Sequence, residues 1–230
     1  MTRHIEAEWL DRLAADEPSA LSSRRDLRRL NAIMGHARLI GRILSRERNL
    51  RRMHSIVDLG GGDGTFLLAL ARKLSLHSPA LSVTIVDPRS RVTEDTLRGF
   101  ETASWKLAVI EADAIEFLNS GSPRCDVIIA NLFLHHLAET SLTRLLSHVA
   151  QLARLFIACE PRRGSFPLLA SQLLGVIGCN HITRHDAPAS VRAGFNGEEL
   201  SRLWPASNEW QLEEYRAGPF SHCFVARHVA

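Results

Sequence analysis

The chain has 230 residues, 45% of them hydrophobic, and a net charge of +3 at pH 7. This size and apolar content predict a single domain with a full core. The four cysteines form no Cys-x-x-Cys pair, so we expect neither a disulfide framework nor a structural zinc site, and a cytoplasmic location is the default. No stretch approaches the roughly 20 apolar residues of a membrane span, and the charged residues 3–6 do not predict a secretory leader.

Basic residues are concentrated at the N-terminal end. Residues 1–52 contain twelve arginines against seven acidic residues, a net charge of +5. Such a segment could meet nucleic acid or anionic lipid, and it could equally be a solvated helix face.

The same segment carries helical patterns. Residues 5–14 read as a short amphipathic helix that Pro18 ends. Ser23 and Asp26 fit a capping start for a second, longer helix. Its apolar residues then recur at helical spacing from Leu27 to Leu44. We therefore expect residues 1–52 to form an N-terminal helical cap.

The most informative stretch follows this cap. The apolar run 55–59 predicts a strand that contains Asp58, the glycines at 60, 61, 62 and 64 predict a tight turn, and the residues from about Asp63 to Leu74 predict a helix. Glycines let the backbone approach a ligand, and the helix N-terminus offers free N–H groups. A strand, a glycine turn and a helix in this order predict a ligand site of a parallel α/β sheet.

Further strands and helices alternate along the residues that follow. Residues 81–87 predict a second strand that ends in Asp87, about 23 residues beyond Gly64. A helix over 93–102 and strands over 106–110, 125–131 and 154–160 complete the pattern. Asp113, followed three residues later by Glu116, is typical of a helix N-cap.

Two of these motifs resemble those of a known family. The order strand, Asp58, Gly60, Gly62, Gly64 resembles motif I of the class I S-adenosylmethionine (SAM)-dependent methyltransferases. The strand at 125–131 and the Leu134–Leu137 sequence Leu-His-His-Leu resemble motif IV of the small-molecule members. The resemblance covers roughly residues 54–160 by motif and the remainder by element order. It implies a Rossmann-like, seven-stranded, mostly parallel sheet with helices on both faces and an antiparallel last strand.

The resemblance also implies where SAM binds. The glycine turn and the end of the fourth strand would both face the aminoacyl end of SAM. Asp87 with Pro88 would face the ribose hydroxyls, and Asp113 with Ala114 would face the adenine. The cofactor-binding residues expected within residues 53–160 are Asp58, Gly60, Gly61, Gly62, Asp87, Pro88, Asp113, Ala114 and Asn131. Asp87 and Asp113 could also serve only a turn and a helix cap.

The expected chemistry is methyl transfer with proton removal. Histidine suits a general base because its ordinary pKa lies near neutrality. His136 is the first candidate and His135 the second, because the pair follows the carboxyl end of a strand, where α/β sites lie. Either could instead serve packing alone. No metal is expected, since the chemistry needs none and no convincing carboxylate cluster is visible.

Residues 161–230 are expected to shape the acceptor pocket and to end in a hairpin. An apolar helix over 168–177, a helix over 195–203 and strands over 210–216 and 219–227 are predicted. Acceptor contacts are assigned to Asn180, His181 and Arg184. The apolar flank favours a small, lipophilic acceptor, most simply a phenolic or quinol hydroxyl; the oligomeric state is left open.

Three other functions stay open. A nucleic-acid methyltransferase would suit the basic N-terminus, although the fourth strand ends in Asn131-Leu132-Phe133 without the proline pair of the amino-methylating DNA enzymes, and a nucleic-acid partner is not expected. An NAD(P)-linked oxidoreductase is disfavoured by Thr65 at the position of the third glycine and by Asp63 in the turn. A non-catalytic SAM-binding protein would differ only in forming no product.

Overall fold

The computed structural model describes residues 1–14, 16–47, 53–74, 81–121 and 124–229. The strands, in chain order, are β1 Ser55–Leu59, β2 Ser82–Val86, β3 Lys106–Ile110, β4 Cys125–Asn131, β5 Ala153–Pro161, β6 Trp210–Ala217 and β7 Ser221–His228. The helices are η1 Leu10–Arg12, α1 Pro18–Met34, α2 His36–Arg46, α3 Thr65–Leu74, α4 Glu94–Thr102, α5 Ala114–Asn119, η3 Leu134–His136, α6 Glu139–Leu152, α7 Ser165–Gln172, α8 His181–Ala193 and α9 Glu199–Leu203.

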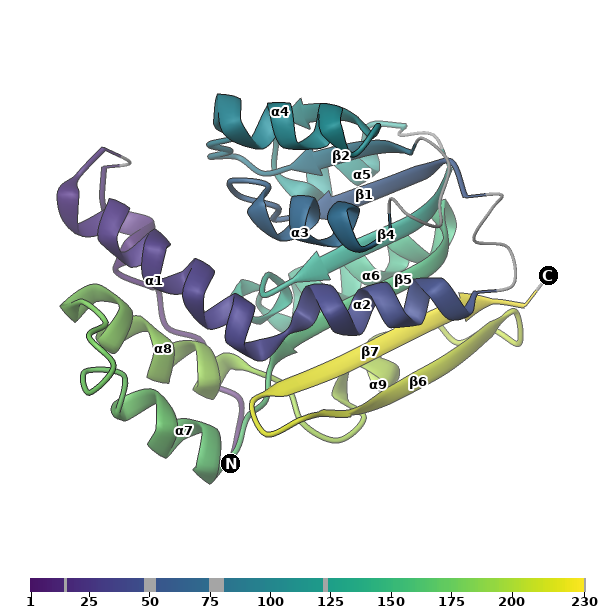
Figure 1. Ribbon diagram of the computed structural model, residues 1–230. Coiled ribbons are helices and arrows are strands. Elements are labelled where there is room, and N and C mark those ends of the chain that lie inside the picture. Colours follow the sequence, from purple (N-terminus) through teal and green to yellow (C-terminus); the bar gives the residue numbers. More distant parts are fainter. Residues whose placement is uncertain (15, 48–52, 75–80, 122–123, 230) are drawn as a thin grey trace.

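The seven strands of the described residues form one sheet, in the order β3-β2-β1-β4-β5-β7-β6 (Figure 1). Strands β1 to β5 pair in parallel, and β7 is antiparallel to both of its neighbours. The predicted Rossmann-like sheet with an antiparallel last strand is therefore confirmed. The strand order reverses between β1 and β4, and at such a switch point the carboxyl ends of the strands open a crevice for ligands.

Two helical layers cover the two faces of the sheet. Side chains of α2, α3 and α4 pack with the sheet in one apolar cluster, and those of α5, α6 and α9 pack with it in a second. Central strands β4 and β5 are buried along almost their whole length, because both faces are covered. No described helix combines the length and the apolar composition needed to cross a membrane.

The N-terminal cap differs from the prediction. Residues 5–14 form no amphipathic helix; only the short η1 is helical there. The backbone of this segment bonds to other elements instead: His4 N–H donates to the Arg192 carbonyl, and the N–H groups of Trp9 and Leu10 donate to the Asp186 carboxylate. Residues 4–10 are thus held against α8 by backbone hydrogen bonds, and we call this segment the N-terminal strap (Figure 1).

The long cap helix also begins and ends elsewhere. Helix α1 begins at Pro18, whose fixed φ and missing N–H suit a first turn. The predicted capping residues Ser23 and Asp26 are buried inside the helix, where Ser23 Oγ lies 2.8 Å from Thr183 Oγ1. Gly35, at φ 71°, then separates α1 from α2. The last predicted cap residues, 48–52, lie outside the described residues.

Between β5 and β6 the chain is more helical than predicted. The expected helix over 168–177 is α7, which ends at Gln172, and the irregular stretch that follows contains the thirteen-residue helix α8. Pro188 lies within α8, and because proline normally interrupts a helix, the sequence did not predict a helix here. The helix expected over 195–203 is reduced to α9, and the terminal hairpin of β6 and β7 is confirmed.

Candidate functional site

A cavity of about 710 Å³ opens at the carboxyl ends of the central strands. Its walls come from the glycine turn, α1, η3, α8 and the segment after α7. Nine of its lining residues lie at motif positions or next to them: Asp58, Gly60, Gly61, Gly62, Asp63, Asp87, Asn131, His135 and His136. The fold thus brings most of the predicted site to one place.

The glycine turn is shaped by close contacts on one side and open space on the other. Gly60, at φ 71°, would place a Cβ 2.5 Å from the Phe133 ring. Gly62, at φ 54°, meets nothing within 4 Å. The turn is therefore packed against the protein at Gly60 and leaves room for a ligand at Gly62.

Asp58 is the most unusual group in the cavity wall. Its side chain is 1% exposed, and neither carboxylate oxygen has a hydrogen-bond partner. Burial, with a smaller contribution from the negative charge of Asp87, raises the pKa of Asp58 to about 8. A buried acid without a donor fits a site that a cationic group of a ligand completes.

The other residues expected around a nucleoside divide into two groups. Asp87 lines the cavity, and its carboxylate accepts hydrogen bonds from the N–H groups of Gly62 and Arg89 at 3.1 and 2.8 Å. Asp113 caps α5 by accepting from the N–H groups of Ile115 and Glu116. Neither Asp113 nor Ala114 nor Pro88 lines the cavity. The cap predicted at Asp113 is confirmed, and its contact with adenine stays a prediction.

Asn131 is held by a chain of side chains that includes a histidine from α2. The Asn131 Oδ1 atom lies 2.7 Å from Nδ1 of His36, whose Nε2 lies 2.6 Å from the Ser221 hydroxyl. Because Oδ1 can only accept, the Nδ1–H of His36 donates and Nε2 accepts from Ser221. Burial lowers the pKa of His36, which keeps its ring neutral in this role.

His135 lies between two carboxylates. Its Nδ1 is 2.7 Å from Oε2 of Glu160, and its Nε2 is 3.7 Å from Oε1 of Glu8. Glu160 also accepts from the N–H groups of Phe133 and Leu134, so it fixes the whole turn after β4. Burial alone would lower the pKa of His135, but the hydrogen bond to Glu160 and the negative charges of Glu160 and Glu8 outweigh it and raise the pKa to about 9.

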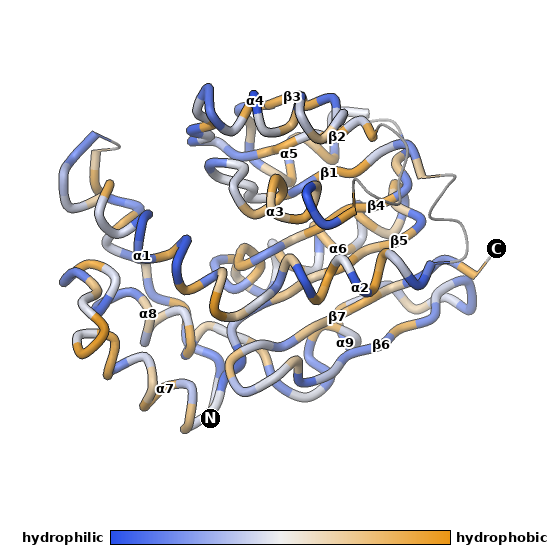
Figure 2. Tube along the Cα trace, in the orientation of Figure 1, coloured by the Kyte–Doolittle hydropathy of each residue, from blue (hydrophilic) through white to orange (hydrophobic). Residues whose placement is uncertain are grey.

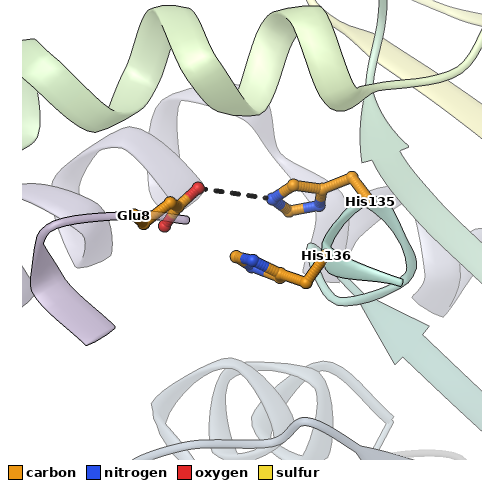
Figure 3. A group of neighbouring side chains, drawn as sticks. All are labelled: Glu8, His135 and His136. Atoms are coloured by element: carbon orange, nitrogen blue, oxygen red, sulfur yellow. Dashed lines mark ion pairs between the residues drawn. The ribbon is translucent and has the colours of Figure 1, made fainter. Parts of the chain in front are cut away.

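His136 lies beside this charged ring. The two imidazole centroids are 4.1 Å apart, and Figure 3 shows both rings directed toward Glu8. Burial and the positive charge of His135 lower the pKa of His136. Burial would raise the pKa of Glu8, but the positive charge of His135 and the hydrogen bond from the Ser190 hydroxyl bring it to about 2. One histidine is thus a cation at neutral pH, while its neighbour is a neutral base.

The same three residues are the group within the described residues whose donor atoms lie close enough to hold a cation. One atom from each of Glu8, His135 and His136 lies within 4.8 Å of the others. The direct pairing of His135 Nε2 with Glu8 accounts for this spacing without an ion. That no metal is needed stays a prediction.

The three residues assigned to the acceptor from sequence lie away from the cavity. Asn180 caps α8, accepts from Thr183 N–H at 2.8 Å and donates to the Ser19 carbonyl. His181 and Arg184 are exposed on the outer side of α8. None of the three lines the cavity, and their contact with an acceptor stays a prediction.

Three residues of the site were missed by sequence reasoning: Glu8, His36 and Glu160. Glu160 ends a buried strand in an acid, as Asp87 follows β2, and this pattern could have identified it. Glu8 and His36 carry no local signal, because each reaches the site through the tertiary arrangement of the N-terminal segment.

Comparison with known proteins shows what the core is similar to. The family model of a methyltransferase domain matches residues 56–154. This part of the chain is therefore similar to a methyltransferase domain. This segment contains the glycine turn, Asp87 and the histidine pair, while Glu8, His36 and Glu160 lie outside it.

The chain is similar to methyltransferases of different kinds. A tRNA1(Val) (adenine(37)-N6)-methyltransferase of Pseudoalteromonas translucida is 33% identical over 91 residues, which is 40% of this chain and 37% of the relative. An O-methyltransferase family protein from Burkholderia thailandensis superposes with a TM-score of 0.57 at 15% identity, over 94% of this chain and 64% of that one. A plantazolicin methyltransferase solved with a triazolic desmethylPZN analogue and SAH gives a TM-score of 0.66 at 12% identity, over 94% of this chain and 92% of that one. At these identities the solved structures show the fold alone.

Proposed function

We propose that this chain is a SAM-dependent methyltransferase that methylates a hydroxyl group of a small, lipophilic molecule, most simply a phenol or quinol. The observation that carries this proposal is Asp58, a buried carboxylate without a partner in the wall of a glycine-lined cavity. The methyltransferase-domain match over residues 56–154 supports it.

The residues present fit the cofactor. SAM has an ammonium group, which would pair with the unpartnered Asp58 carboxylate, and open space at Gly62 leaves room for its aminoacyl end. Asp87 is the proposed acceptor for the ribose hydroxyls, with Pro88 beside it, and Asp113 with Ala114 would face the adenine. Asn131, oriented by His36, is proposed at the aminoacyl end. A neighbour solved with SAH supports the same ligand class.

When bound, SAM supplies a methyl group activated by its sulfonium. The protein then has to orient the acceptor, exclude water and take up the hydroxyl proton. We assign the proton to His136, whose lowered pKa leaves it unprotonated at neutral pH. Glu160 and Glu8 raise the pKa of His135, so its ring stays protonated at neutral pH. We therefore assign His135 the role of positioning the turn and of keeping His136 neutral.

The experiment that tests this function is transfer of labelled methyl from SAM to a panel of alkylated phenols and quinols. We expect product with the unmodified chain in the presence of a chelator, and a loss of about 10² to 10⁴ in rate for His136→Ala. Binding of SAM without product across the panel and with tRNA would favour a non-catalytic SAM-binding protein.

A second candidate acceptor is RNA. The tRNA methyltransferase relative and the arginines of α1 favour it. Some of these arginines have partners within the chain, such as Arg28, whose guanidinium lies 2.8 Å from Asp63. Methylation of unmodified tRNA, with a rate that falls steeply with salt, would establish this candidate in place of the phenol.

A further inference from the structure

Helix α7 buries small residues and exposes large apolar ones. Its buried residues are Pro167 and Ser171, whereas Phe166 and Leu169 are 56% and 58% exposed. A surface helix normally turns its apolar side chains toward the core. Phe166 stacks on the Phe220 ring, with the two centroids 5.7 Å apart, and yet both Phe166 and Leu169 keep more than half of their surface exposed.

The apolar surface continues beyond the helix. Residues 165–180 contain no charged side chain, in a protein in which 23% of residues are charged. Figure 2 shows the segment between α7 and α8 in the hydrophobic colour at the outer edge of the molecule. In this segment Leu173, Val176 and Ile177 are exposed, Val176 to 84%. Such a patch, larger than scattered single residues, marks a binding surface.

This surface is continuous with the wall of the cavity. Ile33 of α1, Leu173, Val176 and Ile177 are all exposed, and all four also line the cavity that contains His136. We call these four residues the apolar mouth. Leu27 and Leu30 of α1 extend the same apolar wall along the cavity.

We propose that the apolar mouth binds the alkyl or acyl chain of the methyl acceptor, so that the substrate is an amphiphile with a polar head at His136 and a tail that leads out between α1 and the segment after α7. This inference rests on the proposed function and specifies its substrate class. A second copy of the chain or a flat bilayer could cover only the outer surface. The structure shows that the apolar mouth is continuous with the cavity wall, and a flexible alkyl or acyl chain can contact both.

The probe is a homologous series of 4-alkylphenols with ethyl, hexyl and decyl chains, titrated calorimetrically into the protein saturated with SAH. A parallel series of primary alcohols with the same chains separates the tail from the phenolic head. Burial of each methylene tightens binding roughly fourfold. We expect dissociation constants to fall steeply with chain length in both series.

Two variants test the mouth itself. Leu173→Gln and Val176→Gln change exposed side chains, so the fold is expected to persist, and each should flatten the dependence on chain length without changing SAH affinity. Leu97→Gln on α4 is the matched control, because Leu97 is also exposed but does not line the cavity. It should leave the series unchanged.

Each outcome has a distinct meaning. Binding of SAH with no dependence on chain length in either series overturns the tail site and leaves the proposed function standing. Loss of SAH binding by the unmodified chain refutes the proposed function instead. Two further outcomes would overturn the inference if neither series depends on chain length. A dimer that Val176→Gln dissociates would assign the surface to a second copy of the chain. Binding to phosphatidylcholine vesicles that Val176→Gln abolishes would assign it to a bilayer.

Discussion

The Nδ1 atom of His135 lies 2.7 Å from Oε2 of Glu160, a carboxylate with no exposed surface at the end of β5. Glu8 approaches the other side of the same ring, at 3.7 Å from Nε2. Residues far apart in the chain thus hold a buried imidazolium beside the cavity. This arrangement fixes the charge next to His136 and leads to the first two predictions.

Replacing Glu160 with glutamine should release the proton of His135. The pKa of His135 is about 9 because Glu160 and Glu8 outweigh burial, and Glu160→Gln should lower it toward the ordinary value. Since a folded-state pKa above the unfolded one stabilises the protein at low pH, this contribution is complete below about pH 6.5 and is lost as pH rises to about 9. Removing one partner of a buried pair costs about 3 kcal/mol.

Urea unfolding of both proteins across this range measures the effect. The free energy of unfolding should differ most between them near pH 6 and least above pH 9. Glu209→Gln, which changes a largely exposed carboxylate, is the control and should have no such effect. An equal difference at both pH values would contradict a charged His135.

His136 should titrate below an ordinary histidine. Burial and the charge of His135 lower its pKa, while Glu8, Asp11 and Glu160 oppose the shift. The rate of methyl transfer should therefore be constant near neutrality and fall only below pH 6.5. His135→Gln removes the positive charge and should move this acid limb to higher pH. NMR titration of the imidazole carbons gives the pKa directly, and a value above 6.5 would exclude the proposed base.

Asp58 should make the ligand-free protein less stable as pH rises. The pKa of Asp58 is raised to about 8 by burial and by Asp87, so the folded state binds the proton more tightly than the unfolded state. Stability from this group is therefore lost between about pH 4 and pH 8. Asp58→Asn should abolish that slope and weaken SAM binding. Unfolding free energies from pH 4 to 8 check this, and identical slopes in both proteins would refute it.

Gly62→Ala should impair ligand binding more than folding. A left-handed residue with a Cβ costs roughly 1–2 kcal/mol, and the added methyl would enter the space left open at φ 54°. Gly197, at φ 65° with nothing within 4 Å, is a matched control outside the cavity. Both variants should lose similar stability, and Gly62→Ala alone should weaken SAM binding about tenfold or more. Equal affinity in the two variants would exclude Gly62 from the site.

The strands and the glycine turn were predictable because their patterns are local. Buried parallel strands read as apolar runs, and Gly60 and Gly62 occupy backbone conformations that other residues rarely adopt. The N-terminal strap was not predictable, since its N–H groups bond to Asp186 on α8 rather than within a helix. For the same reason Glu8 could not be assigned to the site.

Errors in the cap and around α8 have similar physical causes. Ser23 and Asp26 matched a capping pattern, but both face α8, where Asp26 accepts from the Asn180 N–H. The side chain of Asn180 in turn caps α8 by accepting from the Thr183 N–H. Polar residues near a site are thus often used by the helices that frame it.

The central claim is that the glycine turn and Asp58 bind SAM, and calorimetric titration of the purified protein tests it most directly. SAM and SAH would each be titrated, with NAD and NADP as controls. The account predicts binding of SAM and SAH, with proton release below pH 8 as the ammonium pairs with Asp58, and no binding of NAD or NADP. Binding of NAD alone, or SAM binding unchanged in Asp58→Asn, would contradict it.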